Sequence, residues 1–175
     1  VFEKVFTIEK SKEMFLIASQ NLSNTANITL LKGDTRENIP KILSENDEIL
    51  FWLDSHWSGG ETYGEGDECP LIEELKIIFS SPKISVILVD DARLFLAPPY
   101  RPHEAESWPT IGAIVKAMPE NWEMFVYEDV IYLIPESIVV CFKSFLQEKI
   151  TVQHIKSAKK KGIFTRLIER VGFRP

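Results

Sequence analysis

The chain has 175 residues, 45% of them hydrophobic and 26% charged, which is ordinary for one soluble globular domain and leaves little room for a second. The net charge of −6 argues against a protein that binds nucleic acid over its whole surface. The charge is uneven, because residues 150–175 hold seven Lys or Arg and one Glu, a surplus of six positive charges that leaves −12 for the remainder. We therefore describe the chain as an acidic body with a basic tail.

Two cysteines, Cys69 and Cys141, are too few for a disulfide framework, so a reducing, cytoplasmic location is expected. No apolar run approaches the roughly 18–20 residues of a membrane-spanning helix, and no signal peptide is visible. The sequence opens on Val1, directly at a strand-like segment, which suggests a fragment of a longer protein. The oligomeric state is left open.

Hydrophobic periodicity predicts alternating strands and helices along most of the chain. In chain order we expect a strand over 4–9, a helix capped by Ser11, a strand over 27–32, a helix over 36–43, a strand over 48–54, a helix over 70–79, a strand over 84–91, a helix that starts at 108–110 and continues through 118, and strands over 122–127 and 130–134. Pro40 is the weak point of its helix. The two-residue connection Glu128–Asp129 predicts an antiparallel hairpin. The pattern indicates an α/β fold, with a mostly parallel sheet and helices on both faces.

The predicted strands and helices also suggest a division of the chain. Residues 1–137 form the α/β domain, and residues 138–175 form a helical, basic extension in which apolar and basic residues recur at helix-like spacing. Docking of this extension onto a partner or an anionic surface is an alternative to a plain solvated helix.

Acidic residues follow the predicted strands where each one ends. Open α/β sheets bind ligands at the carboxyl ends of their strands, so we expect these acids to converge on one crevice. They are Glu9, Asp34, Asp54, Asp90 and Asp91. The alternative for Glu9 and for Asp34 is that each one caps the helix that follows it.

Asp54, Asp90 and Asp91 would repel one another unless a cation or a proton intervenes. Oxygen-only ligands suit Mg²⁺, Mn²⁺ or Ca²⁺, so a metal site is one prediction. The alternative is that one acid caps a helix and another pairs with Arg93.

His56 and Trp57 lie just beyond the third strand. A loop histidine near an acid can act as a general base or as a ligand, and a tryptophan can stack on a planar ring. The alternative is a loop anchored by a buried Trp57, with His56 exposed. The glycines that follow suit either a mobile lid or simple turns, and they are Gly59, Gly60, Gly64 and Gly66.

Residues 1–135 resemble the class I S-adenosylmethionine-dependent methyltransferases, from the second strand of that family through the fifth to its closing hairpin. The resemblance implies a Rossmann-like fold. The acid, the His-Trp pair and the acids after the next strand look like the catechol O-methyltransferase branch. The resemblance implies that Glu9 binds the ribose and that Asp34 and His56 lie beside the adenine. It also implies that a magnesium ion is held by Asp54, Asp90 and Asp91. Asp54 and Trp57 would then line the cofactor crevice.

Three departures from the family pattern matter. The first strand of the family, with its glycine-rich loop, has no counterpart before Val1, so the sheet is expected to have a gap. The general-base lysine of the catechol branch has no counterpart, and His56 is the substitute we name as catalytic. The loop before His56 is also one residue longer than the branch pattern.

The sequence therefore predicts methyl transfer from S-adenosylmethionine to an oxygen of a small-molecule acceptor, assisted by Mg²⁺. The proline-rich loop 98–108 would cover that acceptor. No nucleic-acid partner is expected. One alternative is a non-catalytic remnant or interaction module, and a second is a metal-dependent hydrolase that uses the same acids.

Overall fold

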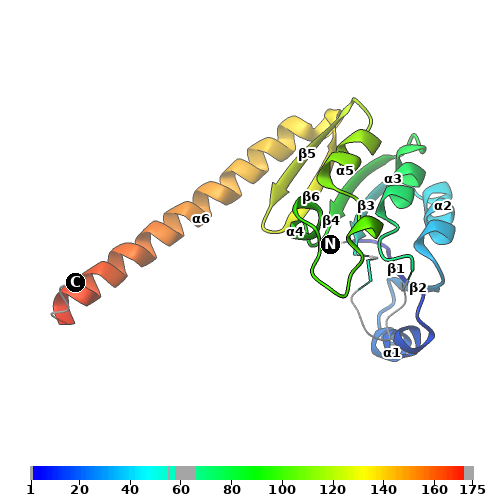
Figure 1. Ribbon diagram of the computed structural model, residues 1–175, viewed down its shortest axis with the longest axis horizontal. Helices are drawn as coiled ribbons and strands as arrows, with labels where there is room; N and C mark the ends of the chain where they lie inside the picture. The colour runs from blue at the N-terminus through cyan, green and yellow to red at the C-terminus, as the bar shows by residue number, and fades with distance from the viewer. Residues whose placement is uncertain (1, 55, 58–65, 172–175) are drawn as a thin grey trace. The chain divides into compact units, whose positions relative to one another are not determined.

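A computed structural model describes residues 2–54, 56–57 and 66–171 of the protein, with side chains described up to residue 158 (Figure 1). The chain divides into two compact units, Val1–Pro135 and Glu136–Pro175, each of which is described by itself.

Strands and helices alternate through the first unit. In chain order they are β1 (Val5–Glu9), α1 (Lys12–Leu22), β2 (Ile28–Lys32), α2 (Thr35–Glu45), β3 (Glu48–Leu53), α3 (Leu71–Phe79), β4 (Ile84–Val89), α4 (Arg93–Leu96), the 3₁₀ turn η1 (Ala105–Ser107), α5 (Ile111–Ala117), β5 (Trp122–Tyr127) and β6 (Val130–Pro135). The second unit is the helix α6 (Glu136–Val171). The predicted strands are all present. The four-residue helix α4 was not predicted, because it is too short to show a period.

Parallel pairing dominates the first half of the first unit and antiparallel pairing the second half. β1 pairs with β2 in parallel, and β3 pairs with β4 in parallel. β6 lies between β4 and β5 and is antiparallel to both, which gives the order β3-β4-β6-β5. The predicted α/β class is confirmed. The described strands form two sheets instead of one, because none of them joins β1 or β2 to β3.

Local sequence explains where several elements begin and end. The Ser11 side chain accepts a hydrogen bond from the backbone N–H of Met14 and caps α1, as predicted. Glu128 and Asp129 both have positive φ, at 48° and 65°, so the β5–β6 connection is the primed type of turn that matches strand twist. α2 continues through Pro40, where its buried side chains hold it against the core.

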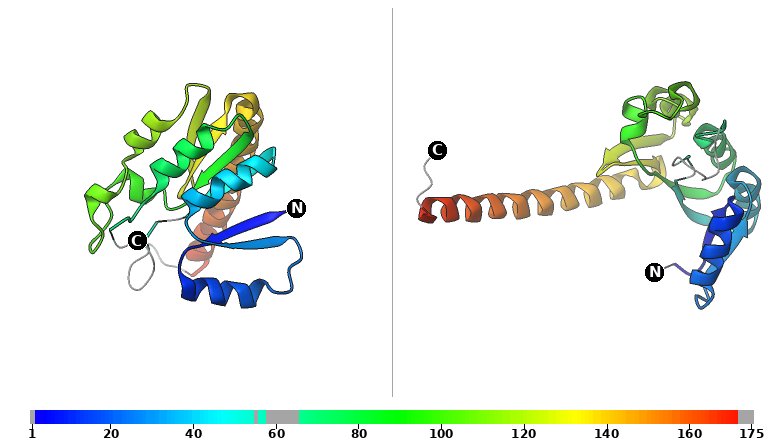
Figure 2. Two further views of the ribbon diagram at one scale, coloured as in Figure 1. Left: turned by 90° about the vertical axis from the view of Figure 1, so that its right-hand side faces the viewer. Right: turned by 60° about the horizontal axis from the view of Figure 1, so that its bottom comes forward.

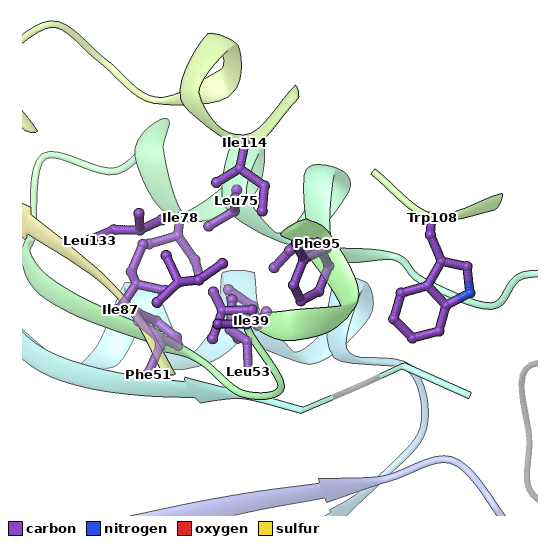
Figure 3. Packing of buried hydrophobic residues seen from close by; sticks show 14 of the residues in the cluster. Ile39, Phe51, Leu53, Leu75, Ile78, Ile87, Phe95, Trp108, Ile114 and Leu133 are labelled. Atoms are coloured by element: carbon purple, nitrogen blue, oxygen red, sulfur yellow. The ribbon is translucent and has the colours of Figure 1, made fainter. Parts of the chain in front are cut away.

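The hydrophobic core lies between one face of the four-stranded sheet and the helices α2, α3 and α5 (Figure 3). Its most deeply buried members include Leu75, Ile78, Ile87, Ile114, Ile131 and Leu133. Trp108 lies at one end of this cluster, beyond Phe95 (Figure 3). α1 packs against β1 and β2 (Figure 2).

The other face of β3 differs from the sequence expectation of helices on both faces. Leu50 and Trp52 point to that side, and 48% and 54% of their surfaces are exposed. In the described residues, this part of the sheet is therefore apolar without being covered.

Across the part of the chain that the structure describes, no helix has both the length and the apolar composition needed to cross a membrane.

Candidate functional site

The carboxyl ends of β3 and β4 lie side by side and bring three predicted acids to one place. Leu53 and Val89 are register partners at the ends of the two strands. The Asp90 N–H donates a hydrogen bond to the Leu53 carbonyl at 3.1 Å, so the pairing continues one residue beyond β4. Asp54 on one strand therefore lies next to Asp90 and Asp91 on the other, as the sequence pattern predicts.

His56 lies between two of these carboxylates. Its Nδ1 is 3.3 Å from Asp54 Oδ1, and its Nε2 is 3.3 Å from Asp91 Oδ2. Only 10% of the His56 side chain is exposed, and its ring lies 5.2 Å from the ring of Trp108. The alternative, in which His56 is exposed, is therefore wrong. An imidazole held at both nitrogens has a fixed orientation, and its protonated form can donate to both carboxylates.

The pKa of Asp54 depends on its surroundings. Burial raises the pKa of Asp54, the positive charge of a protonated His56 lowers it, and the neighbouring charges of Asp90 and Asp91 raise it further. The Asp54 side chain is nevertheless 53% exposed, whereas that of Asp91 is 27% exposed. Asp54 is thus more open to solvent than Asp91.

Asp91 is fixed by its backbone and by a cation. Its φ of 56° lies in the left-handed region, which few residues other than glycine adopt. Its backbone N–H donates to Asp90 Oδ1 at 2.9 Å, and its Oδ1 lies 2.7 Å from Arg93 Nη1. Arg93 also pairs with Asp129 on the β5–β6 turn. Asp91 therefore presents its other oxygen, Oδ2, to His56.

These residues do not fit the predicted metal site. Among the described residues, no three His, Cys, Asp or Glu side chains are placed so that they could hold one metal ion. The carboxylates of Asp54 and Asp91 are instead directed at His56, and Asp91 also pairs with Arg93. The sequence left open the alternative that one of the acids pairs with Arg93, and that acid is Asp91.

Asp34 caps α2 and has no acceptor capacity left. Its Oδ1 accepts from the backbone N–H and from Nε of Arg36, and its Oδ2 accepts from Arg36 Nη2 and from Lys10 Nζ. The four lone-pair positions of the carboxylate are thereby filled. The Arg36 guanidinium, followed by the Lys10 ammonium, holds the pKa of Asp34 far below its usual range, although burial opposes the shift. Asp34 therefore caps the helix that follows it, which was the alternative to a role in cofactor binding. Direct contact with an adenine amino group would require breaking these hydrogen bonds.

The ion pairs of Asp34 lead to a prediction about stability. Asp34→Asn keeps an acceptor for the helix cap but removes the charge, so it is expected to lower the free energy of unfolding by about 2 kcal/mol at pH 7. Because the folded-state pKa is depressed, the contribution of Asp34 is complete above its ordinary pKa of about 4 and is lost as the pH falls below it. Urea denaturation at pH 7 and at pH 3 checks both points.

Asp47→Asn is the matched control for that experiment. Asp47 pairs with Lys83, but its side chain is 87% exposed, so its loss is expected to change stability by less than about 0.5 kcal/mol. Equal effects of the two substitutions, or an Asp34→Asn effect that is the same at both pH values, would contradict the prediction.

Glu9 ends β1 with part of its carboxylate already engaged. Oε1 accepts a hydrogen bond from the Ser11 N–H at 2.7 Å, which steadies the chain just before α1. Among the described residues, no hydrogen bond to Oε2 is present. Glu9 therefore retains an acceptor oxygen at the carboxyl end of β1, where a ribose hydroxyl was predicted to bind.

Trp57 is buried and anchors the segment that follows β3. Its backbone N–H donates to the Glu68 carbonyl at 2.7 Å, and its ring meets His103 edge to face at 5.3 Å. Trp57 thus anchors the loop, as one of the two interpretations of the sequence predicted. Because the ring is buried, it has no exposed face on which a cofactor ring could stack. The predicted lid glycines Gly59, Gly60 and Gly64 lie outside the described residues.

Sequence reasoning missed a buried cluster next to His56, formed by Glu68, His103 and Trp108. Glu68 Oε2 accepts from Trp108 Nε1 at 2.7 Å, and both oxygens lie 3.2 Å from the Glu104 N–H. His103 Nδ1 is 3.4 Å from the same Oε2, and the His103 and Trp108 rings are 5.3 Å apart. The only sequence signal was the density of His and Trp in the proline-rich loop, since Glu68 lies 40 residues from Trp108. Glu68 ties this loop to the start of α3, and Trp108 supports the His56 ring.

No family model and no curated protein matches the sequence. Among solved structures, the chain is similar to the SAH-bound methyltransferase PaMTH1 of Podospora anserina, at 16% identity and a TM-score of 0.49, over 75% of this chain and 60% of that one. It is also similar to yhhF of Escherichia coli, assigned as a methyltransferase, at 14% identity and a TM-score of 0.38, over 75% of this chain and 62% of that one. The chain thus spans less than two thirds of either structure. At these values the likeness says nothing about activity, so function is inferred from the geometry of the site.

Proposed function

We propose that the first unit belongs to an S-adenosylmethionine-dependent methyltransferase that methylates an oxygen atom of a small molecule. The observation that carries this proposal is the position of His56 between Asp54 and Asp91, at the carboxyl ends of two adjacent parallel strands. Ligands of open α/β sheets bind at this edge.

His56 would act as the general base. When bound, the cofactor supplies an electrophilic methyl group on a sulfonium. A hydroxyl that attacked this methyl would lose its proton as the oxygen–carbon bond formed and the sulfur–carbon bond broke, leaving the cofactor as the neutral thioether. A histidine suits the removal of that proton near neutral pH. The acceptor belongs on the Asp54 side, because Asp54 is the more exposed carboxylate and Asp91 is held by Arg93. The proton would pass from the hydroxyl to Nδ1, with the acceptor taking the place of Asp54 at that nitrogen, while Asp91 stabilises the imidazolium through Nε2.

The residues fit the cofactor in part. Glu9 has a carboxylate oxygen for ribose hydroxyls at the end of β1. Asp34 is occupied by Arg36 and Lys10, so its role is to hold the β2–α2 turn beside Glu9. The Gly33 N–H donates to the Glu9 carbonyl at 3.0 Å, which joins the two strand ends.

No divalent metal takes part in this proposal. Two of the three carboxylates that would hold it, those of Asp54 and Asp91, face His56, and Asp91 also pairs with Arg93, so deprotonation of the acceptor is assigned to His56 instead. The metal-dependent hydrolase has no support in this arrangement for the same reason.

A non-catalytic interaction module is the second candidate. The exposed Leu50 and Trp52 on β3 favour it, because an uncovered apolar face is typical of a surface that binds another polypeptide. A module of this kind requires no affinity for the cofactor and no role for His56.

Isothermal titration calorimetry with S-adenosylmethionine separates the two candidates. Under the methyltransferase proposal, the protein binds the cofactor, S-adenosylhomocysteine competes for the same site, and Glu9→Gln weakens binding by about tenfold, as expected for loss of a charged hydrogen bond. EDTA should leave the affinity unchanged. Absence of binding, or binding that Glu9→Gln does not alter, would remove the support for a cofactor site and favour the interaction module.

A further inference from the structure

The helix α6 carries a face that combines apolar and basic residues. Phe142, Phe145, Lys149, Val152 and Lys156 follow one another at intervals of three and four residues, the spacing that places side chains on one side of a helix. The rings of Phe142 and Phe145 are 6.4 Å apart, and Lys149 Nζ lies 5.4 Å from the centre of the Phe145 ring. We call these five residues the aromatic–lysine face.

This face is open to solvent over much of its length. Phe145 is 52% exposed and Val152 is 44% exposed, and the two lysines are exposed as well. Helices in water derive most of their stability from packing of an apolar face, and a row of exposed large hydrophobic residues marks a contact surface. The face extends from Phe142 to Lys156, which is about four turns of the helix.

Charge identifies what would cover it. Residues 150–175 carry a surplus of six positive charges, and the rest of the sequence carries −12. Val152 and Lys156 of the aromatic–lysine face belong to this basic stretch, and the face leads directly into it. A partner of α6 must accept aromatic and aliphatic side chains and lysines along the same strip.

We propose that α6 lies along the surface of an anionic lipid bilayer. Phe145 and Val152 enter the boundary between headgroups and acyl chains, and Lys149 and Lys156 extend to the negatively charged headgroups. Helices that lie in the interface have this combination of apolar and basic residues, and such binding requires no membrane-spanning segment.

Two other occupants fit the face less well. In a coiled coil with a second copy, Lys149 and Lys156 would occupy core positions, where like charges meet and are desolvated. A nucleic acid would accept the lysines but would offer no apolar environment to Val152.

Sedimentation of the full chain with lipid vesicles tests the proposal. We expect binding to vesicles of phosphatidylcholine and phosphatidylglycerol in equal parts, weakened by salt, and no binding to phosphatidylcholine alone. The double variant Lys149→Glu, Lys156→Glu is expected to lower the affinity by at least about 25-fold, which is about fivefold for each lysine. Lys4→Glu combined with Lys12→Glu makes the same change in net charge within the first unit and should change binding little.

A second pair of variants tests the apolar side of the face. Phe145→Gln should weaken binding by about tenfold, whereas Val140→Gln, at an exposed position off the face, should change it little. Equal binding to both kinds of vesicle would overturn the proposal. Dimerisation in light scattering that Phe145→Gln abolishes, or tighter binding to a short DNA duplex than to anionic vesicles, would overturn it as well.

Discussion

His56→Ala is expected to lower the rate of methyl transfer by about 10²- to 10⁴-fold while changing cofactor affinity little. General-base catalysis contributes a factor of this size, and the His56 nitrogens lie 3.3 Å from Asp54 and from Asp91, in the arrangement of an oriented base. The measurement is single-turnover transfer of a radiolabelled methyl group, with the cofactor saturating and a phenolic acceptor of low reactivity. Raising the pH should partly restore the rate of the variant, because a more ionised hydroxyl has less need of a base.

His154→Ala is the matched control for this substitution, since His154 is an exposed histidine on α6 outside the site. Asp91→Asn keeps the shape of the side chain and removes the charge that would stabilise the imidazolium, so it is expected to reduce the rate as well, by a smaller factor than His56→Ala. Equal rates for His56→Ala and His154→Ala would refute the assignment of His56 as the base.

Trp108→Ala is expected to cost about 3–5 kcal/mol of folding stability, the largest single effect on stability that we predict. Trp108 is buried at the end of the core beside Phe95 and His56, and truncation of a buried tryptophan leaves a large cavity. The change also removes the only charge-assisted hydrogen bond of its side chain, the one from Nε1 to Glu68. Guanidinium denaturation followed by circular dichroism measures the loss.

Two further substitutions separate packing from hydrogen bonding at Trp108. Trp108→Phe keeps an aromatic ring but leaves Glu68 Oε2 without its shortest hydrogen bond, which is expected to cost about 1–3 kcal/mol. Glu68→Gln keeps an acceptor for Nε1 and should cost less than Trp108→Phe. If Trp108→Ala destabilised the protein no more than Glu68→Gln, the packing of the ring against Phe95 and His56 would be energetically unimportant.

Local signals made much of the fold predictable. Strands such as β3 and β4 are short apolar runs bounded by turn residues, and the caps Ser11 and Asp34 mark helix starts because a side-chain oxygen must satisfy the free N–H groups there. The split into two sheets depends on which strands pair across the chain, so strand patterns alone do not show it. The exposure of Trp52 likewise depends on what covers the sheet, and the alternation of β3 says only that one of its faces is buried.

The candidate site was predictable where it depends on strand ends and not where it depends on loops. Asp54 and Asp91 meet because β3 and β4 are parallel neighbours. Three neighbouring acids suggest a metal ion from the sequence alone, but the sequence does not show that the loop places His56 between Asp54 and Asp91. Glu68 and Trp108 were missed because loop packing brings together residues that share no period.

The left-handed backbone of Asp91 limits which residues that position can hold. For most side chains this conformation costs about 1–2 kcal/mol, and asparagine and aspartate are among the few that adopt it readily. Of these, only aspartate also supplies the negative charge that His56 and Arg93 face. Glutamate would keep the charge but strain the turn, and glycine would relax the turn but lose the charge. No other residue therefore preserves both the backbone shape and the charge at position 91. We expect fewer substitutions to be tolerated there than at Asp54, which has no positive φ.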